Sequence, residues 1–246
     1  MPPIYVINLD RDVERMASLA RSLEALALPF TRVSAVLGKQ VPDWERLVDA
    51  GLYAARNRLP MPRPGEVGCY LSHLKAMEAF LATDAAWCVI LEDDVEVRPE
   101  CVEVLAALGQ QDDWDLVKLF CFHAGLPVRK RALTATHQLV VHLTRTTSSA
   151  AYAINRRGAA TLLKSMRPIS EQVDHALERP WETGLRVRGV RPLPVVLAPV
   201  AAATTIGYGD RNDRRLPLGR ALRLFCFRAG KEIRRFGYGL AESFLR

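Results

Sequence analysis

The sequence predicts an α/β protein, and three observations support this prediction. Short runs rich in β-branched residues alternate along the chain with segments whose apolar residues recur at helical spacing. The composition, 49% hydrophobic and 25% charged, is typical of a globular protein and excludes disordered, collagen-like and coiled-coil chains. With 246 residues, the chain is long enough to bury a sizeable core without disulfide or metal staples.

The first half of the chain begins with a strand followed by a helix. Ile4–Asn8 is the strand, and Asp12 is placed to cap the helix, whose apolar residues recur every three or four positions. A second strand is predicted at 30–36. Three prolines within residues 60–64 predict a loop, after which an amphipathic helix begins near Gly65.

The second half continues this alternation. A buried strand at 87–91 runs directly into an acidic sequence. Further strands are predicted at 116–120, 138–143, 150–154, 185–191 and 195–198, with helices after Pro99 and at 157–166. No repeat or clear linker divides these elements, so we predict one domain over residues 1–210, followed by a tail over residues 211–246.

The charge of the chain is concentrated in this tail. It holds ten of the 34 Lys and Arg residues but only three of the 27 Asp and Glu residues, so the tail carries the whole net charge of +7. Its apolar residues recur at helical spacing and are Leu218, Leu222, Phe225, Ala229, Ile233, Phe236 and Leu240. A basic amphipathic helix is typical of a membrane-surface element, although packing of the tail against the body fits the pattern as well. Nucleic acid is not expected as a partner, because no recognition motif accompanies the charge.

Cysteines and hydropathy predict the location of the protein. Five cysteines, an odd number without a C-x-x-C pair, favour reduced thiols and a cytosolic protein. No apolar run approaches the roughly 20 residues that a membrane-spanning helix needs. Cys69 and His73 lie four residues apart, but no orienting acid is evident, so a thiol nucleophile is not favoured.

The acidic sequence Glu92-Asp93-Asp94 is the strongest local signal. Side chains alternate along an extended backbone, so Glu92 and Asp94 are expected on one side and Asp93 on the other. The carboxyl end of a buried strand is where open α/β sheets bind ligands. Carboxylates there suit Mg²⁺ or Mn²⁺ together with substrate phosphates. A solvated acidic loop, or capping of the following helix, is the alternative.

Three weaker patterns accompany this motif. Residues 65–73 open a helix with two glycines and a Ser-His pair, which allows close approach of a phosphate, although a structural histidine fits equally. Arg11 and Arg15 are expected on one helical face, where both would reach a diphosphate or form salt bridges within the first turn. Asp174 and His175 offer a base or a further metal ligand, unless they belong to a polar helix surface.

Taken together, four segments resemble glycosyltransferase family 25, the lipopolysaccharide-biosynthesis family that includes procollagen galactosyltransferases. They are residues 4–11 with Arg15, residues 65–73, residues 89–94, and residues 151–154 with Gly158 and Ala159. The resemblance spans about residues 4–206. It implies a GT-A-like nucleotide-sugar-binding fold with a central, mostly parallel sheet flanked by helices, an inverting mechanism, and UDP-galactose or a similar UDP-sugar as donor.

The resemblance also implies roles for individual residues. A divalent metal, Mn²⁺ or Mg²⁺, would be held by Glu92 and Asp94, with Glu92 standing where a strict Asp-x-Asp motif begins. The donor-binding residues it implies are Asn8, Arg11, Arg15, Gly68, Ser72, His73 and Glu92. The first candidate for the catalytic base is Asp174, with Asp93 as the second.

We therefore expect a cytoplasmic enzyme, peripheral on the inner membrane, that transfers a hexose from a UDP-hexose to a lipid-linked oligosaccharide of the lipopolysaccharide type. Galactose is the expected hexose, and residues 211–246 are expected to contact the anionic membrane surface. Two other functions fit the same residues. One is a metal-dependent nucleotidyl- or phosphotransferase, and the other is a non-catalytic membrane-associated adaptor that retains the fold.

Overall fold

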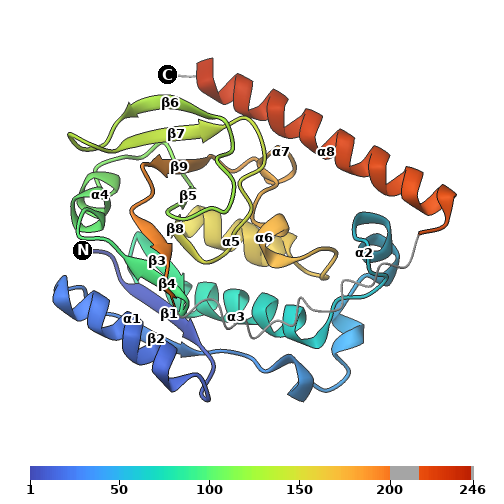
Figure 1. Cartoon of the computed structure of the whole chain (residues 1–246), viewed down its shortest axis with the longest axis horizontal. Helices are drawn as coiled ribbons and strands as arrows, with labels where there is room; N and C mark the ends of the chain where they lie inside the picture. Colours follow the sequence, from blue (N-terminus) through green and yellow to red (C-terminus); the bar gives the residue numbers. More distant parts are fainter. Residues whose placement is uncertain (200–215, 245–246) are drawn as a thin grey trace.

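The computed structural model describes residues 1–199 and 216–244 (Figure 1). Its strands are β1 (Ile4–Asn8), β2 (Thr31–Ser34), β3 (Trp87–Glu92), β4 (Val95–Val97), β5 (Leu116–Lys118), β6 (Pro127–Ala132), β7 (Gln138–His142), β8 (Ala151–Asn155), β9 (Val187–Arg191) and β10 (Val195–Leu197). The helices are α1 (Val13–Ala25), α2 (Ala50–Arg56), α3 (Pro64–Leu81), α4 (Cys101–Leu108), α5 (Arg156–Ser165), α6 (Val173–Ala176), α7 (Pro180–Thr183) and α8 (Leu218–Phe244). Two 3₁₀ turns, η1 (Gly38–Gln40) and η2 (Trp44–Leu47), follow β2.

Eight strands form one sheet in the order β2-β1-β3-β8-β5-β9-β7-β6. Strand β1 pairs in parallel with β2 and β3, and β5 pairs in parallel with β9. Strands β8 and β7 are antiparallel to their neighbours. Six of the eight strands therefore point the same way, which confirms the predicted mostly parallel α/β sheet. Strands β4 and β10 form a separate antiparallel pair.

Helices cover both faces of the sheet, and the alternation of side chains along β1 shows how. Tyr5 and Ile7 pack with buried residues of α3 and α5 on one face. Ile4 and Val6 pack with buried residues of α1 and α4 on the other. This alternation is the period of two expected for a strand buried on both sides. The core is thus divided by the sheet into two apolar layers.

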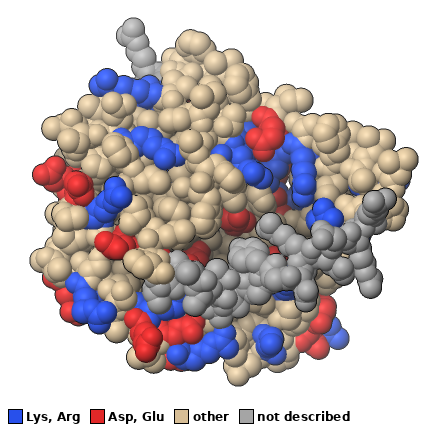
Figure 2. All heavy atoms as spheres, viewed as in Figure 1, with Lys and Arg blue, Asp and Glu red and all other residues tan. Residues whose placement is uncertain are grey.

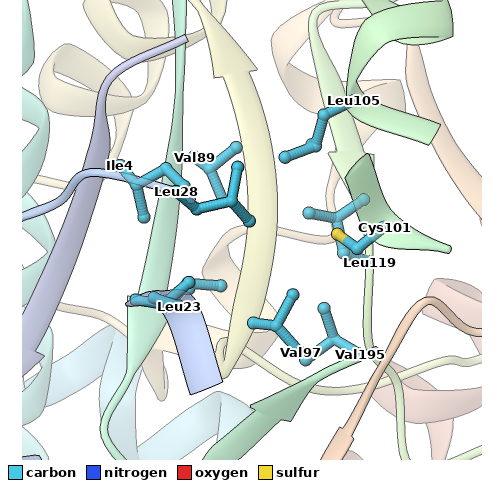
Figure 3. Close-up of a pocket in the computed structure, with 10 residues that line it drawn as sticks. Ile4, Leu23, Leu28, Val89, Val97, Cys101, Leu105, Leu119 and Val195 are labelled. Atoms are coloured by element: carbon cyan, nitrogen blue, oxygen red, sulfur yellow. The ribbon is translucent and has the colours of Figure 1, made fainter. Parts of the chain in front are cut away.

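The second of these layers encloses a small cavity. Figure 3 shows its lining, which includes Ile4, Leu23, Val89, Leu105 and Val195. Its volume of about 10 Å³ is at most that of one water molecule, and its lining is apolar. The cavity is therefore a minor packing gap and not a ligand site.

Some elements were not predicted from the sequence, namely α2, α7, β4 and β6. Strand β6 was missed because it alternates poorly and carries three basic residues in six. The expected tail contains α8, a helix of 27 residues that lies along the outer edge of the molecule. The domain boundary expected at residue 210 lies outside the described residues. No helix within the described ranges is long and apolar enough to cross a membrane.

Candidate active site

The parallel pairing of β1 and β3 brings Asn8 and the acidic motif to one edge of the sheet. Ile7 is opposite Glu92 in the register, so both strands end side by side. The Asn8 side-chain nitrogen donates to Asp93 Oδ2 at 2.7 Å and to the Asp12 carbonyl at 3.0 Å, and its oxygen accepts from Arg32 Nε at 2.9 Å. Asn8 is buried and positions the acidic motif through these bonds. The donor-binding role predicted for Asn8 stays a prediction.

The expected alternation of the three carboxylates is wrong, because β3 ends at Glu92. Asp93 and Asp94 form a turn before β4, and both contact the same guanidinium. Arg15 Nη1 lies 3.1 Å from Asp93 Oδ1, and its Nη2 lies 3.2 Å from Asp94 Oδ2. Asp93 is thus buried against Asn8 and Arg15. That environment makes it a structural carboxylate and a poor candidate for the base.

Glu92 is held from the other side by α3 and by the segment before β8. His73 Nε2 lies 3.2 Å from Glu92 Oε1, and Ser149 Oγ donates to the same oxygen at 2.6 Å. The other ring nitrogen of His73, Nδ1, lies 3.0 Å from the Tyr152 hydroxyl. Because an ionised carboxylate only accepts hydrogen bonds, His73 is the donor to Glu92. His73 has no exposed surface and positions Glu92, and the donor-binding role predicted for it stays a prediction.

These contacts separate the protonation behaviour of the carboxyl groups. Burial raises the pKa of Asp94 to about 6, and the nearby charge of Glu92 adds to this effect against the opposing charge of Arg15. Burial also raises the pKa of Asp93. Burial acts in the same direction on Glu92, but hydrogen bonds from His73 and Ser149 outweigh it and lower the pKa of Glu92. The site therefore places the ionised carboxylate of Glu92 beside Asp94, and a bound cation would favour the ionised form of Asp94.

The oxygen atoms of Glu92 and Asp94 fit a hard divalent cation. Asp94 Oδ1 is buried and has no hydrogen-bond partner among the described residues. An unpaired buried carboxylate oxygen is unfavourable unless a ligand or water satisfies it. Mg²⁺ and Mn²⁺ prefer carboxylate oxygens, with the remaining ligands supplied by phosphates and water. The metal role predicted for Glu92 and Asp94 is compatible with this geometry and stays a prediction.

A second set of possible ligands overlaps the first. Cys69, His73 and Glu92 each offer one ligand atom, and these atoms lie within 4.8 Å of one another. A thiol makes this set softer than the oxygen-only set that Mn²⁺ favours. Metal binding there would break a His73 hydrogen bond to Tyr152 or Glu92. Burial also raises the pKa of the Cys69 thiol, which disfavours the thiolate that would bind a metal. The oxygen set at Glu92 and Asp94 is the better candidate metal site.

The glycine and serine of the predicted helix opening have packing roles. A Cβ atom on Gly68 would lie 2.4 Å from the carbonyl oxygen of Val36 and 2.7 Å from the nitrogen of Gly38. Ser72 Oγ donates to the Gly68 carbonyl at 2.6 Å and accepts from the Val36 N–H at 2.8 Å. Gly68 and Ser72 therefore fasten α3 to the chain after β2. Both residues are buried, and their predicted contact with the donor stays a prediction.

The two arginines near the first helix have different environments. Helix α1 begins at Val13, so Arg11 precedes it and the expected shared helical face is wrong. Arg11 is exposed beside Asp12, whereas Arg15 reaches into the acidic turn. Sequence reasoning missed Arg32, which comes from β2 and bonds to Asn8. The feature of the sequence that could have identified Arg32 is its position in the predicted second strand, which pairs in parallel with β1.

Asp174 lies on α6, and the structure brings it toward the acidic motif. Besides burial, the carboxylates of Glu92, Asp174 and Asp94 all raise the pKa of the Cys69 thiol. The charges of all three carboxylates thus act on one thiol of α3, although Asp174 is about 80 positions from the acidic motif in the sequence. The main-chain N–H of His175 donates to Asp174 Oδ1 at 2.8 Å, and Asp174 remains partly exposed. Of the two candidate bases, Asp174 is the one that a substrate hydroxyl can approach.

Comparison with known proteins agrees with this arrangement. The family model described as "Glycosyltransferase family 25 (LPS biosynthesis protein)" matches residues 1–177. The chain belongs to glycosyltransferase family 25. The matched residues include the sheet edge with Asn8 and the acidic motif, as well as α3 and Asp174. It leaves β9, β10 and α8 outside the matched region.

Individual family 25 relatives show the same likeness over part of their length. A "Glycosyltransferase 25 family member" of Anopheles gambiae is 33% identical over 124 residues, which are 46% of this chain and 21% of that protein. "Procollagen galactosyltransferase 2" of Mus musculus is 28% identical over 124 residues, 46% of this chain and 20% of that protein. The matches thus span about one fifth of these relatives. A structure of the galactosyltransferase LgtC with donor and acceptor sugar analogs aligns at a TM-score of 0.39 and 16% identity, over 76% of this chain and 72% of that one.

Proposed function

We propose that this family 25 chain transfers a hexose from a UDP-sugar to a hydroxyl group of a lipopolysaccharide-type oligosaccharide. Family membership supports glycosyl transfer, and the description of the family supports the class of acceptor. The name of the mouse relative supports galactose as the first hexose to test. The proposed bond change is the replacement of UDP by the acceptor oxygen at the anomeric carbon.

One observation carries the proposal: the environments of Glu92 and Asp94 differ at a single edge of the sheet. Glu92 is fixed and ionised by His73 and Ser149. Asp94 Oδ1 is buried and has no hydrogen-bond partner within residues 1–199 and 216–244. A divalent cation bound by these two carboxylates would neutralise the negative charge that develops on the departing UDP.

The residues of the chain supply the remaining steps. Arg15 holds the acidic turn through its ion pairs with Asp93 and Asp94, and its contact with the diphosphate of the donor stays a prediction. Asp174 accepts the proton of the acceptor hydroxyl as the new bond to the anomeric carbon forms and the bond to UDP breaks. Attack from the face opposite UDP inverts the anomeric configuration, and no covalent intermediate with the protein is needed. Holding both substrates in line supplies much of the acceleration.

Thermal unfolding with a panel of UDP-hexoses, with and without Mn²⁺, tests the donor site. A donor at a hundred times its dissociation constant stabilises the protein by about 2.7 kcal/mol, or roughly 5–10 °C for a chain of this size. We expect this shift to need Mn²⁺ and to disappear in Asp94→Asn, while the exposed control Asp43→Asn retains it. No shift with any UDP-sugar contradicts the proposal. Release of pyrophosphate from UTP and a hexose 1-phosphate, with no transfer of sugar to an acceptor, would identify a nucleotidyltransferase instead.

A further inference from the structure

Helix α8 turns charged side chains toward the body of the protein. Three ion pairs join them, Lys231–Glu171 at 3.0 Å, Arg235–Glu178 at 3.7 Å and Arg188–Glu242 at 2.6 Å. The Tyr238 hydroxyl adds two hydrogen bonds, accepting from the Val187 N–H and donating to the Leu185 carbonyl. The helix is therefore fixed to the body by its polar face, and the tail is not a detached segment.

The opposite face of α8 is apolar and exposed. Its side chains are Leu218, Leu222, Phe225, Ile233, Phe236, Leu240 and Phe244, with exposed fractions between 42% and 85%. At 3.6 residues per turn, these positions share an arc of about 100°. We call this set the outer stripe. It runs the length of a helix of 27 residues, or about 40 Å.

This arrangement reverses that of an ordinary surface helix, whose apolar stripe faces the core. A contiguous exposed apolar surface marks an interaction site. The described part of the body packs against the opposite face of α8 and leaves the outer stripe exposed. Figure 1 shows β6, β7, α7 and α2 on the inner side of the helix, with α8 at the edge of the molecule.

The flanks of the outer stripe indicate the chemistry of its partner. Arg223 and Arg234 lie along one flank, Arg228 and Glu232 lie along the other, and all four are exposed. In Figure 2 the outer edge over α8 is largely tan, with Lys and Arg in blue on its inner side. A long, straight apolar stripe whose flanks carry three arginines and one glutamate matches a flat anionic surface, with acyl chains below and negative headgroups beside them.

We propose that the outer stripe lies in the headgroup region of an anionic bilayer, with the axis of α8 parallel to the membrane plane. The opposite face of the same helix holds the catalytic body through its ion pairs. Glu171, the partner of Lys231, lies three residues before Asp174. The helix that binds lipid is therefore joined to the segment that carries the candidate base, which places a lipid-linked acceptor on the base side of the site. The role in acceptor delivery rests on the proposed function, whereas binding to the bilayer does not.

Flotation of the full chain with lipid vesicles tests this proposal. Vesicles of phosphatidylcholine alone are compared with vesicles that also contain phosphatidylglycerol. We expect binding to the anionic vesicles, weakened by salt. Arg223→Gln with Arg234→Gln is expected to reduce that binding about 30-fold, which corresponds to about 1 kcal/mol for each charge.

A matched pair of apolar variants tests the outer stripe itself. Ile233→Ser with Phe236→Ser removes two exposed side chains from the stripe, and Phe122→Ser with Leu126→Ser removes a similar exposed area elsewhere. We expect vesicle affinity to fall at least tenfold in the first variant only, with unchanged thermal unfolding in both. Equal losses in the two variants, or no flotation of the wild type, would overturn the proposal. Sedimentation of the same proteins without lipid is the second readout. If the wild type forms a dimer that only the stripe variant loses, and the wild type does not bind vesicles, the stripe joins two copies of the chain and the proposal is wrong. Transfer to a soluble acceptor tests the enzyme separately, since it does not require the bilayer.

Discussion

The substitution Glu178→Gln tests whether buried charge fixes α8 to the body. Glu178 Oε1 lies 3.2 Å from Lys118 Nζ, and its Oε2 lies 3.7 Å from Arg235 Nη2. Thr146 Oγ1 also donates to Glu178 at 2.6 Å. None of the three charged side chains is more than 5% exposed. Glutamine keeps the shape of the side chain but removes the buried charge that faces Lys118 and Arg235, which leaves Arg235 with only the half-exposed Glu232.

Two arguments give the same magnitude for this substitution. Although burial opposes ionisation, the charges of Lys118 and Arg235 and the hydrogen bonds lower the pKa of Glu178 from its ordinary 4.5 to about 2. At 1.36 kcal/mol for each pH unit, the ionised form stabilises the folded state by about 3 kcal/mol. Removing one partner of a buried ion pair typically costs about 3–5 kcal/mol. We therefore expect Glu178→Gln to lower the free energy of unfolding by about 3–5 kcal/mol at pH 7.

The pH dependence gives this prediction a second readout. A carboxyl whose pKa is lowered by folding stabilises the protein above its unfolded pKa, near 4.5, and the stabilisation is lost as the pH falls toward 2. The difference in unfolding free energy between wild type and Glu178→Gln is thus constant near neutral pH. It shrinks progressively between about pH 4.5 and pH 2. Other acidic groups titrate in both proteins, so their contributions cancel in the difference.

Urea denaturation of the wild type and the variant from pH 7 down to pH 3 measures both effects. Glu232 supplies the control, because it pairs with the same Arg235 at 3.2 Å but is 47% exposed. Glu232→Gln is expected to change the unfolding free energy by no more than about 0.5 kcal/mol. Equal losses in the two variants, or a difference that does not vary with pH, would refute the buried-charge explanation.

Two further predictions concern the packing and support of the site. Gly68→Ala is expected to lower the unfolding free energy by about 2–3 kcal/mol in urea denaturation, because the new Cβ would lie 2.4 Å from a carbonyl oxygen. Gly65→Ala, with nothing within 4 Å, is expected to stabilise the same helix by up to about 1 kcal/mol. Tyr152→Phe removes the hydroxyl bonded to His73, which is expected to cost about 1 kcal/mol of stability and to weaken UDP-sugar binding several-fold in a calorimetric titration. Unchanged donor affinity in Tyr152→Phe would show that the hydroxyl does not support Glu92.

Local sequence patterns were sufficient to predict most of the sheet. The β-branched residues of β1 and β3 and the helical spacing in α3 each identify one element without knowledge of the others. The position of Glu92 at a strand end followed from the apolar run before it. Patterns did not show that β3 stops at Glu92, because the turn at Asp93 and Asp94 is stabilised by Arg15 from another element.

The support of the site was harder to predict, since it depends on contacts between distant residues. His73 and Tyr152 are 79 positions apart and meet only because β8 pairs with β3. Residues of the Gly-Ser-His segment were assigned to the donor, whereas Gly68 and Ser72 pack α3 against the chain after β2. The sequence also predicted the apolar stripe of the tail correctly. It could not show which side of α8 faces the body, because both faces carry residues able to pack.

The most direct test of the account is transfer itself, measured by NMR with UDP-galactose, Mn²⁺ and a short lipooligosaccharide acceptor. We predict a new glycosidic bond of inverted, β configuration, release of UDP, and a loss of turnover of at least a hundredfold in Asp94→Asn, but not in the surface control Asp43→Asn. An α-linked product would contradict the single-displacement mechanism. Binding of UDP-sugar without transfer to any acceptor would contradict the catalytic role of the site and favour a non-catalytic adaptor.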